Sequence, residues 1–132
     1  MGKRSIIERL KDGVFFIDGA TGTELLKLGV EGAACNELLN VESADMVAAV
    51  HKSYFEAGSD AVLTNTFGSS SISLSRHGLA EEAARLSFAG AELAVKLCGD
   101  DQYVIGDIGP CGDFLEPVGE IKPAALRSSF LE

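Results

Sequence analysis

Three short apolar runs, separated by long amphipathic stretches, stand out in the pattern of hydrophobic and polar positions. They cover residues 14–17, 61–64 and 103–105, and each is almost free of polar side chains. Brief, nearly continuous apolar runs are typical of parallel strands that are covered on both faces. The runs start roughly 40 to 47 residues apart, which is enough for the helical crossover that parallel strands require. The pattern therefore predicts three parallel strands.

The stretches between these runs carry the signals of helices. Apolar residues recur at helical spacing after Ser43, and Gly58 predicts the end of that helix. A long helix is predicted over residues 81–97, because its apolar and small side chains fall on one stripe. A short helix is predicted over residues 23–28, and a last helix begins near Pro123, where proline suits the first turn.

Strands that alternate with helices predict an α/β protein with right-handed crossovers. A doubly wound sheet and a (β/α)8 barrel both fit this alternation, and periodicity does not choose between them. In both architectures the carboxyl ends of the strands form the functional face. Glycine and polar residues gather directly after each predicted strand, at residues 18–22, 65–68 and 107–112. Such loops let backbone N–H groups approach a ligand closely.

Two nucleotide-binding signatures are missing from the sequence. Neither the GxGxxG spacing of a dinucleotide-binding turn nor the GxxxxGK[ST] spacing of a phosphate-binding loop occurs. A doubly wound nucleotide-binding domain is therefore disfavoured.

The charge of the chain limits its partners. The formal net charge is −9, from 20 acidic and 11 basic residues. An acidic surface repels phosphate groups, so neither nucleic acid nor an anionic membrane is an expected partner. The sequence has no apolar run long enough to span a bilayer and no signal-peptide pattern at its start. We therefore expect a soluble, cytoplasmic protein.

The three cysteines, Cys35, Cys98 and Cys111, are odd in number and widely spaced. A disulfide framework needs an even set, and a zinc knuckle needs close pairs, so reduced thiols are expected. Cys35 is predicted to pack, Cys98 to lie half-buried at a helix end, and Cys111 to be a small turn residue. His51 is predicted at the edge of the core, and no catalytic role is assigned to it.

Five blocks of the sequence, in order, resemble the homocysteine S-methyltransferase family. They are DGATGT at 18–23, CNELLN at 35–40, HKSYFEAGSD at 51–60, TNTFG at 64–68 and GDIGP at 106–110. Their order and spacing are most similar to the N-terminal module of the cobalamin-dependent methionine synthases. The resemblance covers about residues 10–125 and implies a (β/α)8 barrel of the TIM type. Residues 1–132 would then be the N-terminal part of one barrel domain, holding its first three βα units.

The resemblance also implies an activity. In this family a zinc ion held by three cysteine thiolates binds homocysteine, and the resulting thiolate attacks a methyl group to form methionine. The methyl donor is a corrinoid, a folate derivative or another methylated compound. The zinc cysteines of the family follow later strands, so zinc is expected in the full-length domain with its ligands outside this chain. Cobalamin would belong to a partner module, and the chain alone is expected to be inactive.

The resemblance implies substrate-binding residues after each strand. No residue of the chain is expected to be the catalyst or to bind a metal. Residues 18–20 would meet the amino-acid end of homocysteine, and the later loops would line the same pocket. The expected substrate-binding residues are Asp18, Gly19, Ala20, Asn65, Thr66, Phe67 and Gly109.

Two alternatives remain open from the sequence. A non-catalytic small α/β module could use the same glycine-rich face to bind an amino acid or another small carboxylate. A closed barrel needs eight βα units and about 250 residues, so the chain is expected to be a fragment of a longer enzyme. Otherwise, its open sheet would be completed by a partner copy, and self-association through the exposed sheet edges is possible in either case.

Overall fold

Two short parallel strands lie at the centre of the computed structural model, which describes residues 3–32 and 34–131. β1 (Ala61–Leu63) and β2 (Tyr103–Ile105) pair in register, with Val62 opposite Val104. They coincide with the second and third apolar runs. The predicted α/β class with parallel pairing is therefore confirmed for these two strands.

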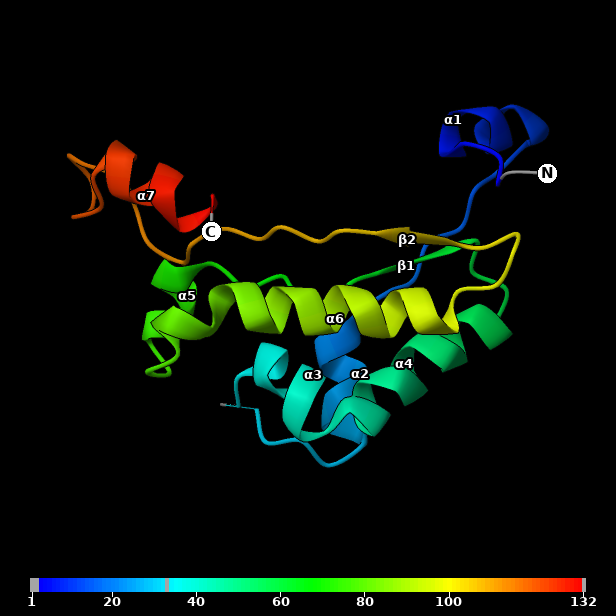
Figure 1. The fold of residues 1–132 in the computed structure, drawn as a ribbon, viewed down its shortest axis with the longest axis horizontal. Helices are drawn as coiled ribbons and strands as arrows, with labels where there is room; N and C mark the ends of the chain where they lie inside the picture. Colours follow the sequence, from blue (N-terminus) through cyan, green and yellow to red (C-terminus); the bar gives the residue numbers. More distant parts are fainter. Residues whose placement is uncertain (1–2, 33, 132) are drawn as a thin grey trace.

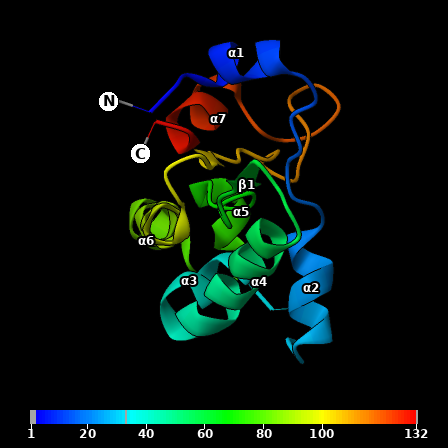
Figure 2. The same cartoon turned by 90° about the vertical axis from the view of Figure 1, so that its right-hand side faces the viewer.

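Helices surround the strands unevenly. α4 and α6 lie against one side of the strands, with α2 and α3 beyond them, whereas α1 and α7 lie on the other side at opposite ends of the molecule (Figures 1 and 2). The helices are α1 (Ile6–Arg9), α2 (Thr21–Lys27), α3 (Leu39–Glu42), α4 (Ala44–Glu56), α5 (Ser71–Ser75), α6 (Ala83–Leu97) and α7 (Pro123–Ser129). Short 3-10 turns cover Leu10–Asp12, Asn36–Leu38 and Ala80–Glu82.

The first predicted strand is reduced to a single bridge. Ile17 forms a parallel bridge with Ala61, so its place beside β1 is as expected, but residues 14–17 do not form a strand. At each end of this bridge, an aspartate side chain accepts the hydrogen bond that a backbone carbonyl would accept in a continued parallel ladder. Asp60 Oδ2 accepts from Phe16 N at 2.8 Å, and Asp18 Oδ2 accepts from Leu63 N at 3.0 Å.

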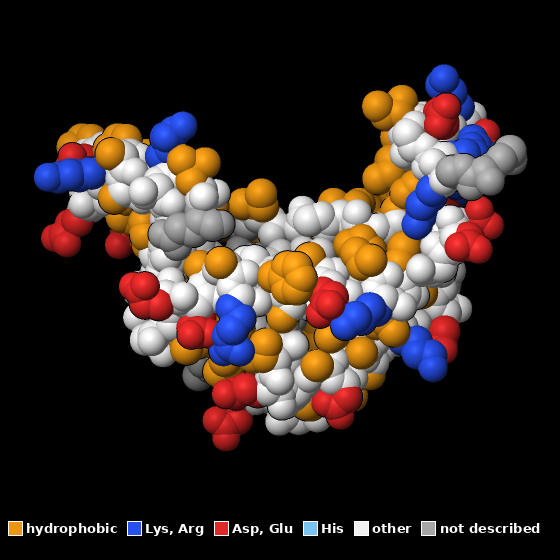
Figure 3. Space-filling view, in the orientation of Figure 1, with side chains coloured by type: hydrophobic (Ala, Val, Ile, Leu, Met, Phe, Trp, Pro, Cys, Tyr) orange, Lys and Arg blue, Asp and Glu red, His pale blue; other side chains and the backbone are white. Residues whose placement is uncertain are grey.

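The side of the strands that faces away from α4 and α6 is largely open. Val14, Phe16 and Ile17 are each more than half exposed. Figure 3 shows the molecule hollowed between α1 and α7, with hydrophobic side chains on the wall of the hollow. Among the described residues, none of the helices has the length and apolar character needed to cross a membrane.

The predicted helices are present with small shifts: α6 begins at Ala83 rather than at residue 81, and α2 covers Thr21–Lys27 rather than residues 23–28. α4 ends at Glu56, and Gly58 takes the positive φ of +101° that such an ending favours. α6 ends at Leu97, and α7 starts at Pro123. The short helices α1, α3 and α5 were not predicted, because four or five residues are too few to show a periodic stripe.

The core lies between α4, α6 and the strands. Phe55, Val62 and Ala94 pack together there. Leu25 of α2 and Val47 and Val50 of α4 form a second cluster between those two helices. A third cluster joins Cys35 to α5 and α6, so the predicted packing role of Cys35 is confirmed. The predicted inner stripe of α6 is also confirmed: Ala83, Leu86, Gly90 and Ala94 are buried.

His51 differs from its prediction. It is completely buried in α4 rather than placed at the edge of the core. Neither ring nitrogen has a hydrogen-bond partner among the described residues. Burial lowers the pKa of His51, because a charged imidazole loses its hydration there.

Gly90 is the point at which α6 comes closest to the residues after β1. A Cβ atom at this position would lie 2.6 Å from Asn40 Nδ2 and 2.9 Å from Thr66 Cγ2. Both distances are too short for real contacts. Glycine is therefore required by the close approach and not by the backbone conformation, which is helical.

Replacing Gly90 with alanine is expected to lower the free energy of unfolding by about 1–3 kcal/mol, the usual cost of overpacking. Helix propensity alone would raise the free energy of unfolding by about 1 kcal/mol. Urea denaturation measures the change in this free energy. The reverse substitution Ala84→Gly, on the exposed face of α6, is the control that measures propensity without packing. A Gly90→Ala variant at least as stable as the wild type would contradict the close packing.

Candidate functional site

The residues that follow β1 and β2 meet at one edge of the sheet, because the strands are parallel. Their hydroxyl and backbone groups form a closed set of hydrogen bonds. Thr64 Oγ1 lies 2.6 Å from Thr66 Oγ1, which donates to Asp107 O at 2.7 Å, and Asp107 N donates back to Thr64 Oγ1 at 3.0 Å. Gly109 N also donates to Phe67 O at 3.0 Å. The two loops are therefore held as one unit.

A buried pair of amides supports this unit from beneath. Asn40 Nδ2 donates to Asn65 O at 2.8 Å and to Leu86 O at 3.2 Å. Asn65 Nδ2 donates to Asn40 Oδ1 at 2.9 Å and to Asn36 O at 2.8 Å. Both side chains are buried, so the amide of Asn65 faces the interior, and its two hydrogen bonds hold the structure together.

Asp18 is half-buried at the same edge. Its Oδ2 accepts from Leu63 N, whereas its Oδ1 is buried and has no hydrogen-bond partner among the described residues. Burial raises the pKa of Asp18, and the nearby charge of Asp107 raises it further. A buried carboxylate oxygen without a donor is costly, and a cationic ligand would relieve that cost.

The neighbours of Asp18 present backbone to solvent. Gly19 and Ala20 are exposed, and they lead directly into α2. A Cβ at Gly19 would lie 3.0 Å from Tyr54 Oη, so the backbone approaches this tyrosine closely. Burial raises the pKa of Tyr54, and the carboxylates of Glu24 and Asp18 add to the effect.

Two further carboxylates belong to this edge: Asp107, whose charge acts on Asp18, and Glu37, whose charge acts on Asp107. Burial raises the pKa of Asp107, and the charge of Glu37 acts in the same direction. Glu37 Oε1 accepts from Gly68 N at 2.7 Å, directly after the segment that carries Thr66 and Phe67. The edge is therefore acidic and partly desolvated, which suits a ligand that carries an ammonium group.

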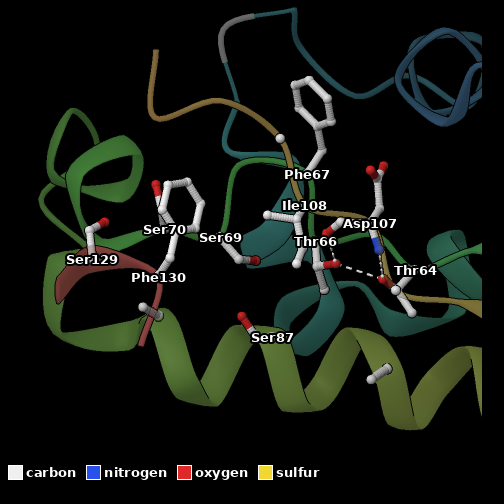
Figure 4. Close-up of a pocket in the computed structure, with 14 residues that line it drawn as sticks. Thr64, Thr66, Phe67, Ser69, Ser70, Ser87, Asp107, Ile108, Ser129 and Phe130 are labelled. Atoms are coloured by element: carbon white, nitrogen blue, oxygen red, sulfur yellow. Dashed lines mark hydrogen bonds between the residues drawn. The ribbon is translucent and has the colours of Figure 1, made fainter. Parts of the chain in front are cut away.

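A cavity of about 300 Å³ lies beside this edge, between the two loops, α6 and α7 (Figure 4). Three of the seven predicted binding residues line it: Thr66, Phe67 and Gly109. Figure 4 shows the Phe67 ring and the Asp107 carboxylate pointing away from Ser87 of α6. The carboxylate of Asp107, which also belongs to the lining, thus points away from α6, and the other lining residues are mainly hydroxyl-bearing or apolar.

The seven predicted residues are thus not all in one cavity. Asp18, Gly19 and Ala20 lie outside the lining of the cavity, and Asn65 lies beneath the loop. Sequence reasoning missed Asn40 and Glu37, which hold the loop after β1. Both belong to the CNELLN block, where the polar side chains that flank two adjacent leucines were the available signal.

The cysteines of the chain do not converge. Cys35 packs in a core cluster, Cys111 donates to Asp113 O at 3.4 Å, and Cys98 is half-buried beside the end of α6, as predicted. In the part of the chain that the structure describes, no group of three or more Cys, His, Asp or Glu side chains is placed to hold a metal ion. The described residues therefore do not fit the three-thiolate zinc site implied by the resemblance.

The raised pKa of Asp18 predicts a dependence of stability on pH. Folding favours the protonated form, so this contribution is present below about pH 4 and is lost as pH rises through the raised pKa. Asp18→Asn keeps an acceptor for Leu63 N and removes the charge. Its unfolding free energy relative to the wild type should therefore increase between about pH 3 and pH 7.

Urea denaturation across this pH range measures the effect. Asp101→Asn, at an exposed position in a turn, is the matched control and should show no such trend. A difference between Asp18→Asn and the wild type that stays constant with pH would contradict the desolvation of Asp18.

The chain is similar to known methyl-transfer proteins over nearly its whole length. The sequence model of the family described as homocysteine S-methyltransferase matches residues 15–132. The chain is 36% identical to methionine synthase of Mycobacterium tuberculosis and 35% identical to that of Mycobacterium leprae, each over 141 aligned positions. Each alignment covers 96% of this chain, but only 12% and 11% of the two relatives.

Solved structures agree in fold. The metallated form of the homocysteine methyltransferase MmuM from Escherichia coli matches with a TM-score of 0.67 and 25% identity, over 78% of this chain and 40% of that protein. Its oxidized form matches with a TM-score of 0.70 and 26% identity, over 83% and 42%. With the family match over residues 15–132, these similarities show that the chain belongs to the homocysteine S-methyltransferase family.

Proposed function

We propose that residues 1–132 form the N-terminal part of a (β/α)8 barrel whose full-length protein methylates homocysteine to methionine. β1, β2 and the segment bridged at Ile17 would be the first three strands of that barrel. The chain spans about an eighth of the curated relatives and about two-fifths of the solved structures, so the rest of the barrel would come from a longer protein. The family match favours this enzyme over a non-catalytic binding module.

The single observation that carries the proposed substrate site is the unpartnered, buried Oδ1 of Asp18. The ammonium group of homocysteine would donate to this oxygen, while Oδ2 stays bonded to Leu63 N. Gly19 and Ala20 are exposed, and their backbone would meet the substrate carboxylate beside the Tyr54 hydroxyl, which approaches Gly19. Asp18 thus binds and orients the amino-acid end without taking part in the chemical step.

The residues after β1 and β2 would shape the remainder of the pocket. Thr66, Phe67 and Gly109 are held together by the hydrogen bonds between the two loops. Asn65 would contribute through its backbone, because its side chain is engaged with Asn40. A rigid wall of this kind fixes the direction in which the substrate thiol points.

Zinc, when bound in the longer protein, would supply the acidity that makes the homocysteine sulfur a thiolate near neutral pH. Its ligands would lie outside the described residues. The methyl donor would be a corrinoid carried by a partner module, a folate derivative or another methylated compound. A cytoplasmic location, without nucleic-acid or membrane partners, completes the proposal.

The unpaired outer sides of the sheet, along β2 and along residues 14–17, also have a role in this proposal. In the longer protein the outer edges of β2 and of residues 14–17 would pair with the remaining strands of the barrel. In the isolated chain the same edges, with the exposed side chains of Val14, Phe16 and Ile17, would favour self-association.

Kinetics of the full-length protein test the proposal. Wild-type protein should contain zinc and transfer a methyl group to homocysteine, and residues 1–132 alone should not. Asp18→Asn should raise the homocysteine KM by about tenfold, because a hydrogen bond to a charged group is replaced by a neutral one. Asp101→Asn serves as the control and should leave KM unchanged.

A full-length protein without bound zinc, and without activity toward homocysteine with any of the methyl donors, would contradict the proposed function. An unchanged KM in an active Asp18→Asn variant would instead contradict the role given to Asp18.

A further inference from the structure

Glu37 has a carboxylate in an unusual setting, beneath the loop that follows β1. Its Oε1 accepts from Gly68 N at 2.7 Å, and its Oε2 accepts from Cys35 Sγ at 3.5 Å. No Lys, Arg or His side chain among the described residues pairs with it. The carboxylate is thus bound by one backbone amide and one thiol, without a cation to neutralise it.

The approach of Glu37 to the loop depends on glycine. A Cβ at Gly68 would lie 2.9 Å from Glu37 Oε1. A side chain at position 68 would therefore displace the Glu37 carboxylate from this position. A hydrogen bond from an amide to a charged acceptor is stronger than one between neutral groups, so this contact restrains the loop firmly.

The restraint extends beyond Gly68. The preceding residue, Phe67, accepts from Gly109 N through its backbone oxygen at 3.0 Å. Glu37 therefore acts on the loop after β1 directly and on the loop after β2 through it. The proposed pocket residues Thr66, Phe67 and Gly109 all lie within two residues of these two bonds.

Glu37 also acts through its charge. It raises the pKa of Asp107, which in turn raises the pKa of Asp18. Two other titratable groups face these carboxylates: the Cys35 thiol, which donates to Glu37, and the Tyr54 hydroxyl, on which the charge of Asp18 acts. Removal of the charge at position 37 would therefore let Asp107 ionise at lower pH.

We propose that Glu37 is a positioning residue for the substrate edge, and that its carboxylate holds the loop after β1 in the conformation that receives the amino acid. The inference rests on the proposed function, because homocysteine is the amino acid in question. Glu37 does not touch the reacting atoms in this proposal. It acts through Gly68 and, by its charge, through Asp107.

Two variants separate the hydrogen bond from the charge. Glu37→Gln keeps an oxygen acceptor for Gly68 N and removes the charge, whereas Glu37→Ala removes both. Glu42→Ala, at an exposed position five residues along the chain, is the matched control. Hydrogen–deuterium exchange of the full-length protein reports on the loop without any substrate, through the peptide that contains residues 64–70.

We expect exchange in this peptide to be at least about tenfold faster in Glu37→Ala, because the bond that protects Gly68 N is lost. Glu37→Gln and Glu42→Ala should remain close to the wild type. Glu37→Ala should also raise the homocysteine KM by about tenfold with kcat nearly unchanged, since only substrate placement is affected. In Glu37→Gln the homocysteine KM near neutral pH should be close to that of the wild type. The acid limb of the pH profile of kcat/KM should move to lower pH, because the negative charge that raises the pKa of Asp107 is removed.

Exchange in Glu37→Ala that matches the wild type would overturn the proposal, as would a loss of kcat without a change in KM. If Glu37→Ala does not fold, Glu37→Gln alone decides. Exchange in residues 64–70 of Glu37→Gln that is much faster than in the wild type would overturn the proposal, and so would an unshifted acid limb of its pH profile. A wild-type protein that does not methylate homocysteine would defeat the proposed function, whereas the exchange data would still decide whether Glu37 holds the loop.

Discussion

Beneath the carboxyl ends of the strands, the side-chain amides of Asn40 and Asn65 bond to each other and to three backbone carbonyls. These bonds tie the CNELLN block, the loop after β1 and α6 to a single buried point. An amide or carbonyl left unpaired in such a place costs about 1–3 kcal/mol. The three segments are therefore expected to hold or loosen together, and the small size of Gly90 is what lets α6 reach the pair.

The buried Asn40–Asn65 pair supports the loops that follow β1 and β2. Hydroxyls and backbone groups of the two loops satisfy one another, so the loops need no ligand to be ordered. The carboxylates of Asp18, Asp107 and Glu37 remain without cationic partners among the described residues. A rigid base with unneutralised, partly desolvated carboxylates favours a ligand with an ammonium group over a neutral or anionic one. The bond from Asn65 Nδ2 to Asn36 O also fixes the backbone next to Glu37, whose carboxylate accepts from Gly68 N.

Much of this architecture could be predicted from the sequence, because apolar runs and helix-ending glycines are local signals. The bounds of α4, α6 and α7 follow from them. The loss of the first strand could not be predicted, since it depends on two contacts between distant residues. The Asp18 carboxylate accepts from Leu63 N, and the Asp60 carboxylate accepts from Phe16 N. The inward turn of Asn65 was missed for a similar reason: its partner Asn40 is distant in sequence. His51 is polar by type but packs where an apolar residue would be expected.

The measurement that tests the account most directly is hydrogen–deuterium exchange of the full-length protein carrying Asn40→Ala. Asn36→Ala is the control, because it preserves the backbone carbonyl that accepts from Asn65 Nδ2. We expect faster exchange in residues 36–40, in residues 64–68 and in the first turns of α6 together. Faster exchange confined to residues 36–40, with the loop after β1 and α6 unchanged, would contradict the claim that one buried amide pair holds these three segments together.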